Sequence, residues 1–163
     1  MKKSPKITIA SFTSKDVKQA HTLLHHVIRH HPNYGKEARN HWESFYTPAK
    51  LRTYLKNKEW IMLVAKHGPK VIGFTNVWQM WGGVARSDWS VVHPAYQHLG
   101  IGAALLTAKL KACKKKGCHK MITDSIPSNK AGERLLKSTG WKKIAKLKNH
   151  WFKQDYLLWE RLL

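Results

Sequence analysis

The sequence predicts a single α/β domain in which helices flank a mixed, mostly antiparallel sheet. Three observations lead to this fold class. The chain has 163 residues, enough for one domain that buries roughly 70% of the surface its unfolded form exposes. Runs of β-forming residues alternate with runs of helical spacing. No internal repeat or low-complexity linker divides the chain, so we expect one domain over residues 1–163.

The first half of the chain predicts a strand, three helices and a hairpin. Apolar residues with a 3.6-residue period follow a capping segment at 14–16, which indicates an amphipathic helix. Gly68 and Pro69 lie within a turn at 66–70 between two runs of β-forming residues, which indicates a hairpin. The expected elements are a strand around 7–12, helices at 17–28, around 42–46 and around 51–55, and hairpin strands at 61–65 and 71–78.

The second half of the chain predicts further strands alternating with two helices. One helix opens at Gly100 and ends at Gly117, because glycine readily adopts the left-handed conformation that closes a helix. Gly140 stops the other helix. The expected elements are strands at 84–92, 121–123, 141–147 and 156–162, and helices from 100 and at 129–138.

The chain carries a large positive charge, because 30 Lys and Arg residues against 9 Asp and Glu residues give +21. Such a surface attracts polyanions, so RNA or another polyanion is a candidate partner. Hydrophobic residues make up 42% of the sequence and include 8 Trp, which excludes intrinsic disorder as the main state. No run reaches the ~18 apolar residues that span a bilayer, so we expect a soluble, cytoplasmic protein without a transmembrane segment.

The sequence predicts no metal site. Cys113 and Cys118 lack a second pair that could complete a zinc site, and we expect reduced thiols. Histidine pairs four residues apart can chelate a metal on a helix, but no acidic residue completes either of the two pairs. These pairs are His21 with His25 and His26 with His30.

The segment 91–106 is the most informative for chemistry. A strand runs into a turn that contains Gly100 and Gly102, and a helix follows directly. Glycine lets a backbone approach a ligand closely, and the free N–H groups and positive dipole at a helix start suit a pyrophosphate. A plain helix cap is the alternative interpretation of these glycines. A Walker phosphate-binding pattern is absent.

Two motifs resemble the GNAT N-acetyltransferase superfamily. The first resembles its V-x-P-x-x-Q/R-x-x-G-x-G/A signature, at Val92, Pro94, Gln97, Gly100 and Gly102. The second resembles its N-x-x-A-x-x-L-Y-x-x-x-G-F segment, at Asn129, Leu135, Gly140 and Trp141. The resemblance covers 91–141, and the order of elements on both sides is compatible with the same fold.

The resemblance implies an acetyl-CoA-dependent N-acetyltransferase with a cleft where the fourth and fifth strands splay apart. Acetyl-CoA, or another acyl-CoA, would donate its acyl group to a primary amine by direct attack in a ternary complex. The backbone of Val91 and Val92 would hold the pantetheine arm, and Asn129 would contact the arm, cap the following helix, or do both. The pyrophosphate would lie on the N–H groups of Gln97, His98, Leu99, Gly100, Ile101, Gly102 and Ala103.

The chain departs from the family pattern at two positions. Leu136 stands where the family usually has the tyrosine that protonates the departing CoA thiolate, and leucine cannot donate a proton. Because a thiol has a pKa of ~8.5, its thiolate is a tolerable leaving group at neutral pH. The loss of the tyrosine therefore slows the reaction without forbidding it. Gly132 replaces the usual alanine, which costs helix propensity, up to about 1 kcal/mol.

Asp88 is the candidate general base that removes a proton from the acceptor amine. A two-residue period would place Asp88, Ser90 and Val92 on one strand face beside the cleft. The alternative for Asp88 is an ion pair with one of the many basic residues. His93 is a candidate proton relay or a plain turn residue.

Trp42 and Trp78 are the residues expected to bind the acceptor, with Trp81 and Trp89 nearby and core packing as the alternative for all four. Two tryptophans lining a pocket would indicate an acceptor with an apolar or aromatic part. A surface at +21 disfavours a polycation, so we expect an acidic small molecule, a peptide N-terminus or an RNA-associated amine.

A second function class is a non-catalytic nucleic-acid-binding or CoA-sensing module on the same fold. Leu136 and the basic surface are its evidence. Five lysines on or after the helix that opens at Gly100 are expected on its solvated face, where they could contact RNA or the CoA 3′-phosphate. These are Lys109, Lys111, Lys114, Lys115 and Lys116.

Overall fold

Seven strands form one sheet in the order β1-β2-β3-β4-β5-β7-β6. The computed structural model describes residues 6–163, so residues 1–5 of the expected domain lie outside the described residues. The strands are β1 Ile7–Ser11, β2 Trp60–His67, β3 Lys70–Gln79, β4 Val84–Val92, β5 Lys120–Ser125, β6 Lys142–Leu147 and β7 Tyr156–Leu162. The helices are α1 Val17–Arg29, α2 Lys36–Phe45, α3 Pro48–Lys56, α4 Ile101–Lys115 and α5 Lys130–Ser138.

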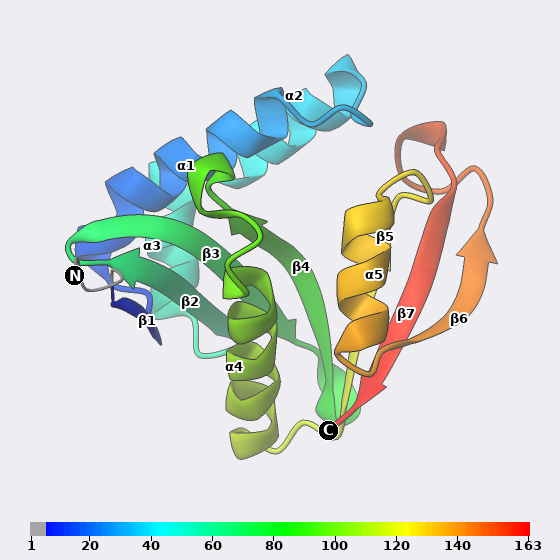
Figure 1. Cartoon of the computed structure of the whole chain (residues 1–163). Helices are drawn as coiled ribbons and strands as arrows, with labels where there is room; N and C mark the ends of the chain where they lie inside the picture. Colours follow the sequence, from blue (N-terminus) through cyan, green and yellow to red (C-terminus); the bar gives the residue numbers. More distant parts are fainter. Residues whose placement is uncertain (1–5) are drawn as a thin grey trace.

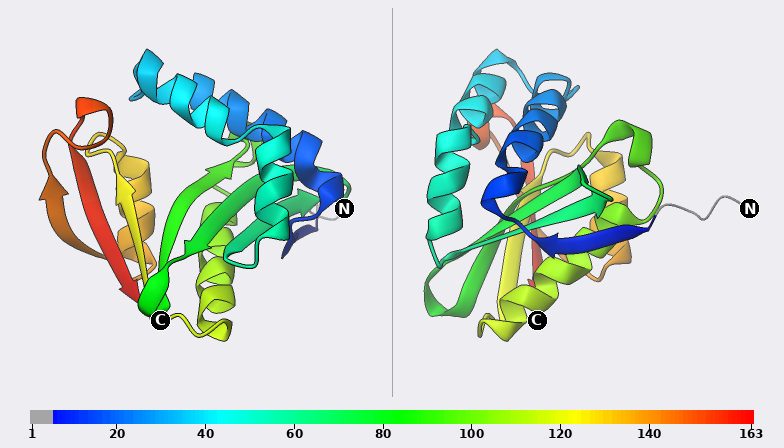
Figure 2. Two further views of the ribbon diagram at one scale, coloured as in Figure 1. Left: turned by 180° about the vertical axis from the view of Figure 1, so that it is seen from behind. Right: turned by 90° about the vertical axis from the view of Figure 1, so that its left-hand side faces the viewer.

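The helices divide between the two faces of the sheet (Figures 1 and 2). The first three, α1 to α3, cover one face, and α4 and α5 cover the other. Leu24, Tyr46 and Phe74 belong to the core under α1 to α3, whereas Leu105 and Leu106 pack under α4. The expected α/β architecture with a mostly antiparallel sheet is therefore confirmed.

Two strands at the centre of the sheet separate along their length. β4 and β5 pair in parallel only from Val84 opposite Lys120 to Arg86 opposite Ile122. Beyond these residues the strands diverge, as the left view of Figure 2 shows. All other strand pairs are antiparallel. The splayed central pair that the resemblance implies is confirmed.

Most element boundaries match the sequence expectations within three residues, but α2, expected around 42–46, begins at Lys36. Gly117 follows α4 with φ of 86°, as predicted for a helix end. The hairpin between β2 and β3 turns over Gly68 and Pro69 alone, because β2 continues to His67 and β3 begins at Lys70. The predicted turn at 66–70 was too long.

A β-bulge in β4 changes which side chains share a face. Thr75 of β3 pairs with Ser90, but Val77 pairs with Ser87, so β4 carries one extra residue in this interval. The predicted common face of Asp88, Ser90 and Val92 is therefore wrong. Ser87 and Ser90 both face α4, where Lys109 reaches them, and Val92 packs in the cluster of Ile101 and Leu105.

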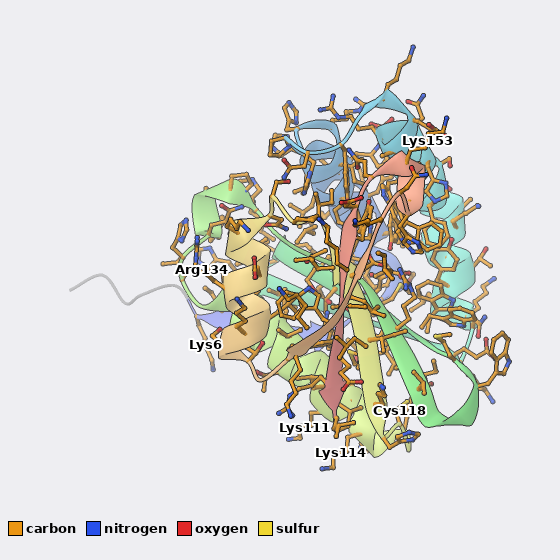
Figure 3. The ribbon with its side chains drawn as sticks, turned by 90° about the vertical axis from the view of Figure 1, so that its right-hand side faces the viewer. Lys6, Lys111, Lys114, Cys118, Arg134 and Lys153 are labelled. Atoms are coloured by element: carbon orange, nitrogen blue, oxygen red, sulfur yellow. The ribbon has the colours of Figure 1, made fainter. Side chains whose placement is uncertain are left out.

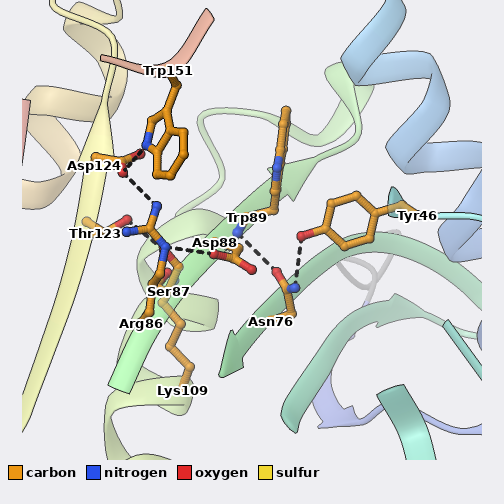
Figure 4. A network of polar contacts seen from close by, with 10 residues as sticks. All are labelled: Tyr46, Asn76, Arg86, Ser87, Asp88, Trp89, Lys109, Thr123, Asp124 and Trp151. Atoms are coloured by element: carbon orange, nitrogen blue, oxygen red, sulfur yellow. Dashed lines mark hydrogen bonds and ion pairs between the residues drawn. The ribbon is translucent and has the colours of Figure 1, made fainter. Parts of the chain in front are cut away.

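Asn76 of β3 stabilises the bulge from the opposite face. Its Oδ1 accepts a hydrogen bond from the Trp89 N–H at 3.0 Å, and its Nδ2 donates to the Tyr46 hydroxyl at 2.9 Å (Figure 4). A fully buried amide with both ends bonded fixes the backbone of β4 beside Asp88. The bulge thus presents Asp88 toward the α1 to α3 side of the sheet, where its charge acts on Tyr46.

None of the helices within residues 6–163 has the length and apolar character that crossing a membrane requires.

Candidate active site

A cavity of about 300 Å³ occupies the splay between β4 and β5. Its walls come from both strands, from α4 and α5, and from the segment that joins α1 to α2. Four of the residues predicted to bind acetyl-CoA line it, namely Val91, Val92, Gln97 and Asn129. Leu136, at the position of the family's tyrosine, lines it as well.

The turn before α4 presents a row of free backbone donors beside this cavity. Within residues 6–163, the N–H groups of residues 98–103 make no hydrogen bond. His98 and Gly100 have φ of 64° and 75°, which turns successive N–H groups toward a common side. Free donors at the positive end of a helix suit a pyrophosphate. The turn therefore fits the phosphate groups of acetyl-CoA.

Gln97 and Gly102 contribute to this turn in other ways than the free amides. The Gln97 N–H donates to Pro94 O at 3.3 Å, and its Nε2 donates to Val92 O at 3.3 Å, which holds the turn against β4. A Cβ at Gly102 would lie 3.3 Å from Leu135 Cδ2. Gly102 therefore leaves room for the Leu135 side chain of α5.

Asn129 caps α5 at the edge of the cavity. Its Oδ1 accepts a hydrogen bond from the Gly132 N–H at 3.0 Å, so the capping interpretation is confirmed. A Cβ at position 132 would lie 2.7 Å from Asn129 Nδ2. The glycine that replaces the family's alanine thus leaves the space in which the Asn129 amide lies.

An arginine joins two carboxylates where the strands separate (Figure 4). Arg86 Nε lies 3.2 Å from Asp88 Oδ1, and its Nη2 lies 2.6 Å from Asp124 Oδ2. The Trp151 indole N–H donates to the same Asp124 oxygen at 3.1 Å. Burial raises the pKa of Asp88 above its ordinary value, and the adjacent Arg86 opposes that rise. The ion-pair interpretation of Asp88 is confirmed, and the pairing also fixes its carboxylate in place.

An aromatic cavity of about 720 Å³ opens on the other side of Arg86 and Asp88. Trp42 and Trp78 both line it, as predicted for residues that bind the acceptor. Its other ring-bearing walls are His41, Phe45, Tyr54, Trp60, Trp151 and Phe152. Glu59 also lines it and accepts a hydrogen bond from the Trp78 indole N–H at 3.3 Å.

Trp81 and Trp89 differ from the other two tryptophans. Trp81 is 81% exposed, on the turn before β4, and lines neither cavity. Trp89 is 8% exposed and packs in the core under α1 to α3, with one surface on the first cavity. Core packing is thus the main role of Trp89.

Three residues connect the two cavities. Trp42, Arg86 and Asp88 line both. The Asp88 side chain therefore borders both the first cavity and the second. Such a junction permits direct transfer between two bound substrates.

Lys109 is a site residue that sequence reasoning misplaced. It is 2% exposed and lines the first cavity, whereas we expected it on a solvated helix face. Its Nζ donates to Ser87 Oγ at 2.5 Å and to Ser90 Oγ at 2.8 Å. Burial lowers the pKa of Lys109 to about 7. The sequence signal was the four-residue spacing from Leu105 through Lys109 to Cys113, which places all three on one buried stripe.

Other candidates have structural roles. The His93 Nδ1 accepts a hydrogen bond from the Ala95 N–H at 3.2 Å, so His93 caps the turn, which was the second interpretation of this residue. Cys113 and Cys118 are buried and free. Among the residues described, no group of three His, Cys, Asp or Glu side chains is placed to hold a metal ion.

Known proteins provide an independent comparison. Residues 20–141 match the model of the Acetyltransferase (GNAT) family. The PaiA N-acetyltransferase of Thermoplasma acidophilum, solved in complex with coenzyme A, has 20% identity and a TM-score of 0.82, covering 97% of this chain and 99% of that chain. No curated protein sequence matches the chain.

Two further neighbours are named for acetylation of ribosomal proteins. The ribosomal-protein-alanine N-acetyltransferase of Brucella melitensis has 18% identity and a TM-score of 0.81, covering 96% of this chain and 99% of that chain. The ribosomal-protein-S18-alanine N-acetyltransferase of Escherichia coli has 17% identity and a TM-score of 0.76, covering 96% and 94%. At 17–20% identity, the solved neighbours establish the fold alone. The family model matches residues 20–141, which is most of the chain. The chain belongs to the GNAT family and is an acetyl-CoA-dependent N-acetyltransferase.

Proposed function

We propose that the chain transfers an acetyl group from acetyl-CoA to a primary amine that carries an apolar or aromatic substituent. The observation that carries this proposal is the meeting of the two cavities at Asp88. One cavity leads to the free amides before α4, and the other is walled by aromatic rings. Each cavity thus suits one of the two substrates.

The donor side of the site binds through backbone atoms. The N–H groups of residues 98–103 would receive the pyrophosphate. The backbone of Val91 and Val92, at the edge that β4 leaves unpaired with β5, would hold the pantetheine arm. The Asn129 amide at the start of α5 would contact the arm near its thioester end.

Asp88 serves as the general base in this proposal. The acceptor arrives as an ammonium ion and attacks only after losing a proton. A raised pKa makes the Asp88 carboxylate a stronger proton acceptor than an ordinary aspartate. Arg86 holds the carboxylate at the junction of the cavities, with Asp124 on its other side.

The aromatic cavity restricts the class of acceptor amine more than the net charge of the chain does. Aromatic faces attract an ammonium ion and also bury apolar surface. Glu59 and Asp88 are the acids of its walls, and Arg86, which also lines the cavity, is paired with Asp88. A single ammonium on an apolar group therefore suits the cavity. A polycation would meet only these few acids. The names of the neighbours suggest a peptide N-terminus as one amine to test.

A panel of amines tests the proposal through release of CoA thiol from acetyl-CoA. We expect phenethylamine or tryptamine to give higher kcat/KM than putrescine or spermidine, with a peptide beginning in alanine as a third arm. Mass spectrometry of the product should show one added acetyl group. Absence of amine-dependent release across the panel, together with salt-sensitive RNA binding, would favour the non-catalytic module.

A further inference from the structure

We propose that Lys109 protonates the departing CoA thiolate, the role that the family usually gives to a tyrosine at the position of Leu136. This inference rests on the acetyl transfer proposed above. Both residues line the same cavity, Lys109 from α4 and Leu136 from α5. The missing acid therefore has a replacement on the neighbouring helix.

The surroundings of Lys109 leave one of its protons free for a ligand. An ammonium group has three N–H donors, and two of them go to Ser87 Oγ and Ser90 Oγ. Figure 4 shows the side chain extending from α4 toward β4 at Ser87. By contrast, Lys111 and Lys114 of the same helix are exposed and point away from the sheet (Figure 3). Among these lysines, Lys109 alone lines the cavity.

The position of Lys109 along the cavity corresponds to the thioester end of the donor. Gln97 and the free amides mark the phosphate end, at the start of α4. Ser87 and Arg86 mark the opposite end, where β4 begins to pair with β5. An arm that runs along β4 from the phosphates would carry its sulfur toward Ser87, Ser90 and Lys109.

The proposed step balances in protons and bonds. The neutral acceptor amine, deprotonated by Asp88, adds to the thioester carbonyl. The nitrogen of the tetrahedral intermediate then loses its second proton to solvent, and the C–S bond breaks. The sulfur takes the electron pair and receives a proton from the Lys109 ammonium. The neutral lysine regains a proton from solvent through the hydroxyl group of Ser90, which is an exposed residue. The proton on Asp88 leaves to solvent. The products are the amide, CoA thiol and one released proton.

The groups around Lys109 make it a proton donor at neutral pH. The titratable groups that act on it are Cys113 of its own helix and Asp88 of β4, both of which raise its pKa against the larger effect of burial. Asp124 of β5 lines the same cavity and is paired with Arg86. The facing part of α5 presents Leu135 and Leu136, which do not titrate. The resulting pKa of Lys109 is about 7. A general acid is most effective when its pKa lies near the pH at which the enzyme works.

Lys109→Met tests the inference, with Lys111→Met as the matched control on the exposed face of α4. We expect Lys109→Met to lower kcat by about 10²-fold at pH 7, the lower end for general acid catalysis, while CoA still raises the melting temperature as in wild type. The wild-type kcat should fall as pH rises through the pKa of Lys109, and the variant should lose this decline. Lys111→Met should retain both the rate and the profile.

Two further variants separate proton donation from a structural role. In the Lys109→Met background, Leu136→Tyr should recover part of the lost rate, because it supplies a donor from α5. Ser90→Ala removes an acceptor from the ammonium, so the decline in kcat should move to lower pH.

Several results would overturn the assignment. Unchanged kcat and pH profile in Lys109→Met would show that Lys109 is not the acid. Acetylation of Lys109 itself, seen by mass spectrometry after incubation with acetyl-CoA, would make it an acceptor instead. Absence of any wild-type turnover would overturn the proposed function and this inference with it, whereas an active wild type isolates the role of Lys109.

Discussion

Replacing Arg86 by methionine removes the group that holds two carboxylates where β4 and β5 separate. The side chains of Asp88 and Asp124 are only 11% and 14% exposed. Removing one partner of a buried ion pair costs ~3–5 kcal/mol, because the remaining charge stays unpaired and poorly hydrated. Methionine retains the packing of the arginine stem, and the carboxylates can take up protons. We therefore expect a loss of about 3 kcal/mol in the free energy of unfolding.

Urea and thermal denaturation measure this loss. For a chain of this size, about 3 kcal/mol corresponds to roughly 6 to 12 °C in melting temperature. Burial already raises the pKa of Asp88 and Arg86 opposes that rise, so the substitution should raise the pKa further. A carboxyl with a raised pKa binds protons more readily in the folded state, so the loss should shrink as pH falls from neutral through that pKa.

The matched control is Arg134→Met, because Arg134 is exposed and makes no ion pair within residues 6–163. It should change the free energy of unfolding by less than about 0.5 kcal/mol. A loss below about 1 kcal/mol in Arg86→Met, or a loss of equal size at every pH, would refute the reasoning.

Two further substitutions address the two cavities. Gly102→Glu places an anion where phosphate is expected and pushes against Leu135, so saturating CoA should no longer raise the melting temperature; an unchanged rise would remove the phosphate site from this turn. Trp78→Ala should raise KM for aromatic amines by roughly tenfold while the affinity for CoA stays constant, since Trp78 lines only the aromatic cavity; equal KM for aromatic and aliphatic amines in wild type and variant would argue against that cavity as the acceptor site.

The fold, and the conformation of the turn proposed to bind the donor, were largely predictable from the sequence. In the turn before α4, Gly100 adopts φ of 75°, a backbone conformation that favours glycine. The residue type at this position therefore predicts the conformation directly. Strand and helix periods placed the main elements within a few residues, except for the start of α2. Trp42 and Trp78 were expected together because both fall on elements that border the cleft, and they line one cavity.

The arrangement around Asp88 was not predictable by period alone. A strand of uniform period places Asp88 and Ser90 on one face, but the bulge inserts a residue between them. The bulge depends on Asn76, which is distant in sequence and bonds the Trp89 N–H. Asp124 was overlooked because its role requires Arg86, which reaches it across the splay.

Lys109 shows a different limit of sequence reasoning. The many lysines near it in the sequence favoured a position on a solvated helix face. The four-residue spacing from Leu105 and Cys113, which indicates a buried position, was given less weight. Burial depends on Ser87 and Ser90, which accept hydrogen bonds from the ammonium across the helix–sheet interface. Those partners face the same side only because of the bulge.

The central claim is that donor and acceptor meet at the Asp88 carboxylate, and Asp88→Asn tests it most directly. The amide keeps the size of the side chain but is a far weaker base. With the best amine of the panel, we predict that kcat falls by roughly 10² to 10⁴-fold while the dissociation constant for CoA remains near the wild-type value. Wild-type turnover by Asp88→Asn at neutral pH would contradict the claim and assign the proton transfer to another group.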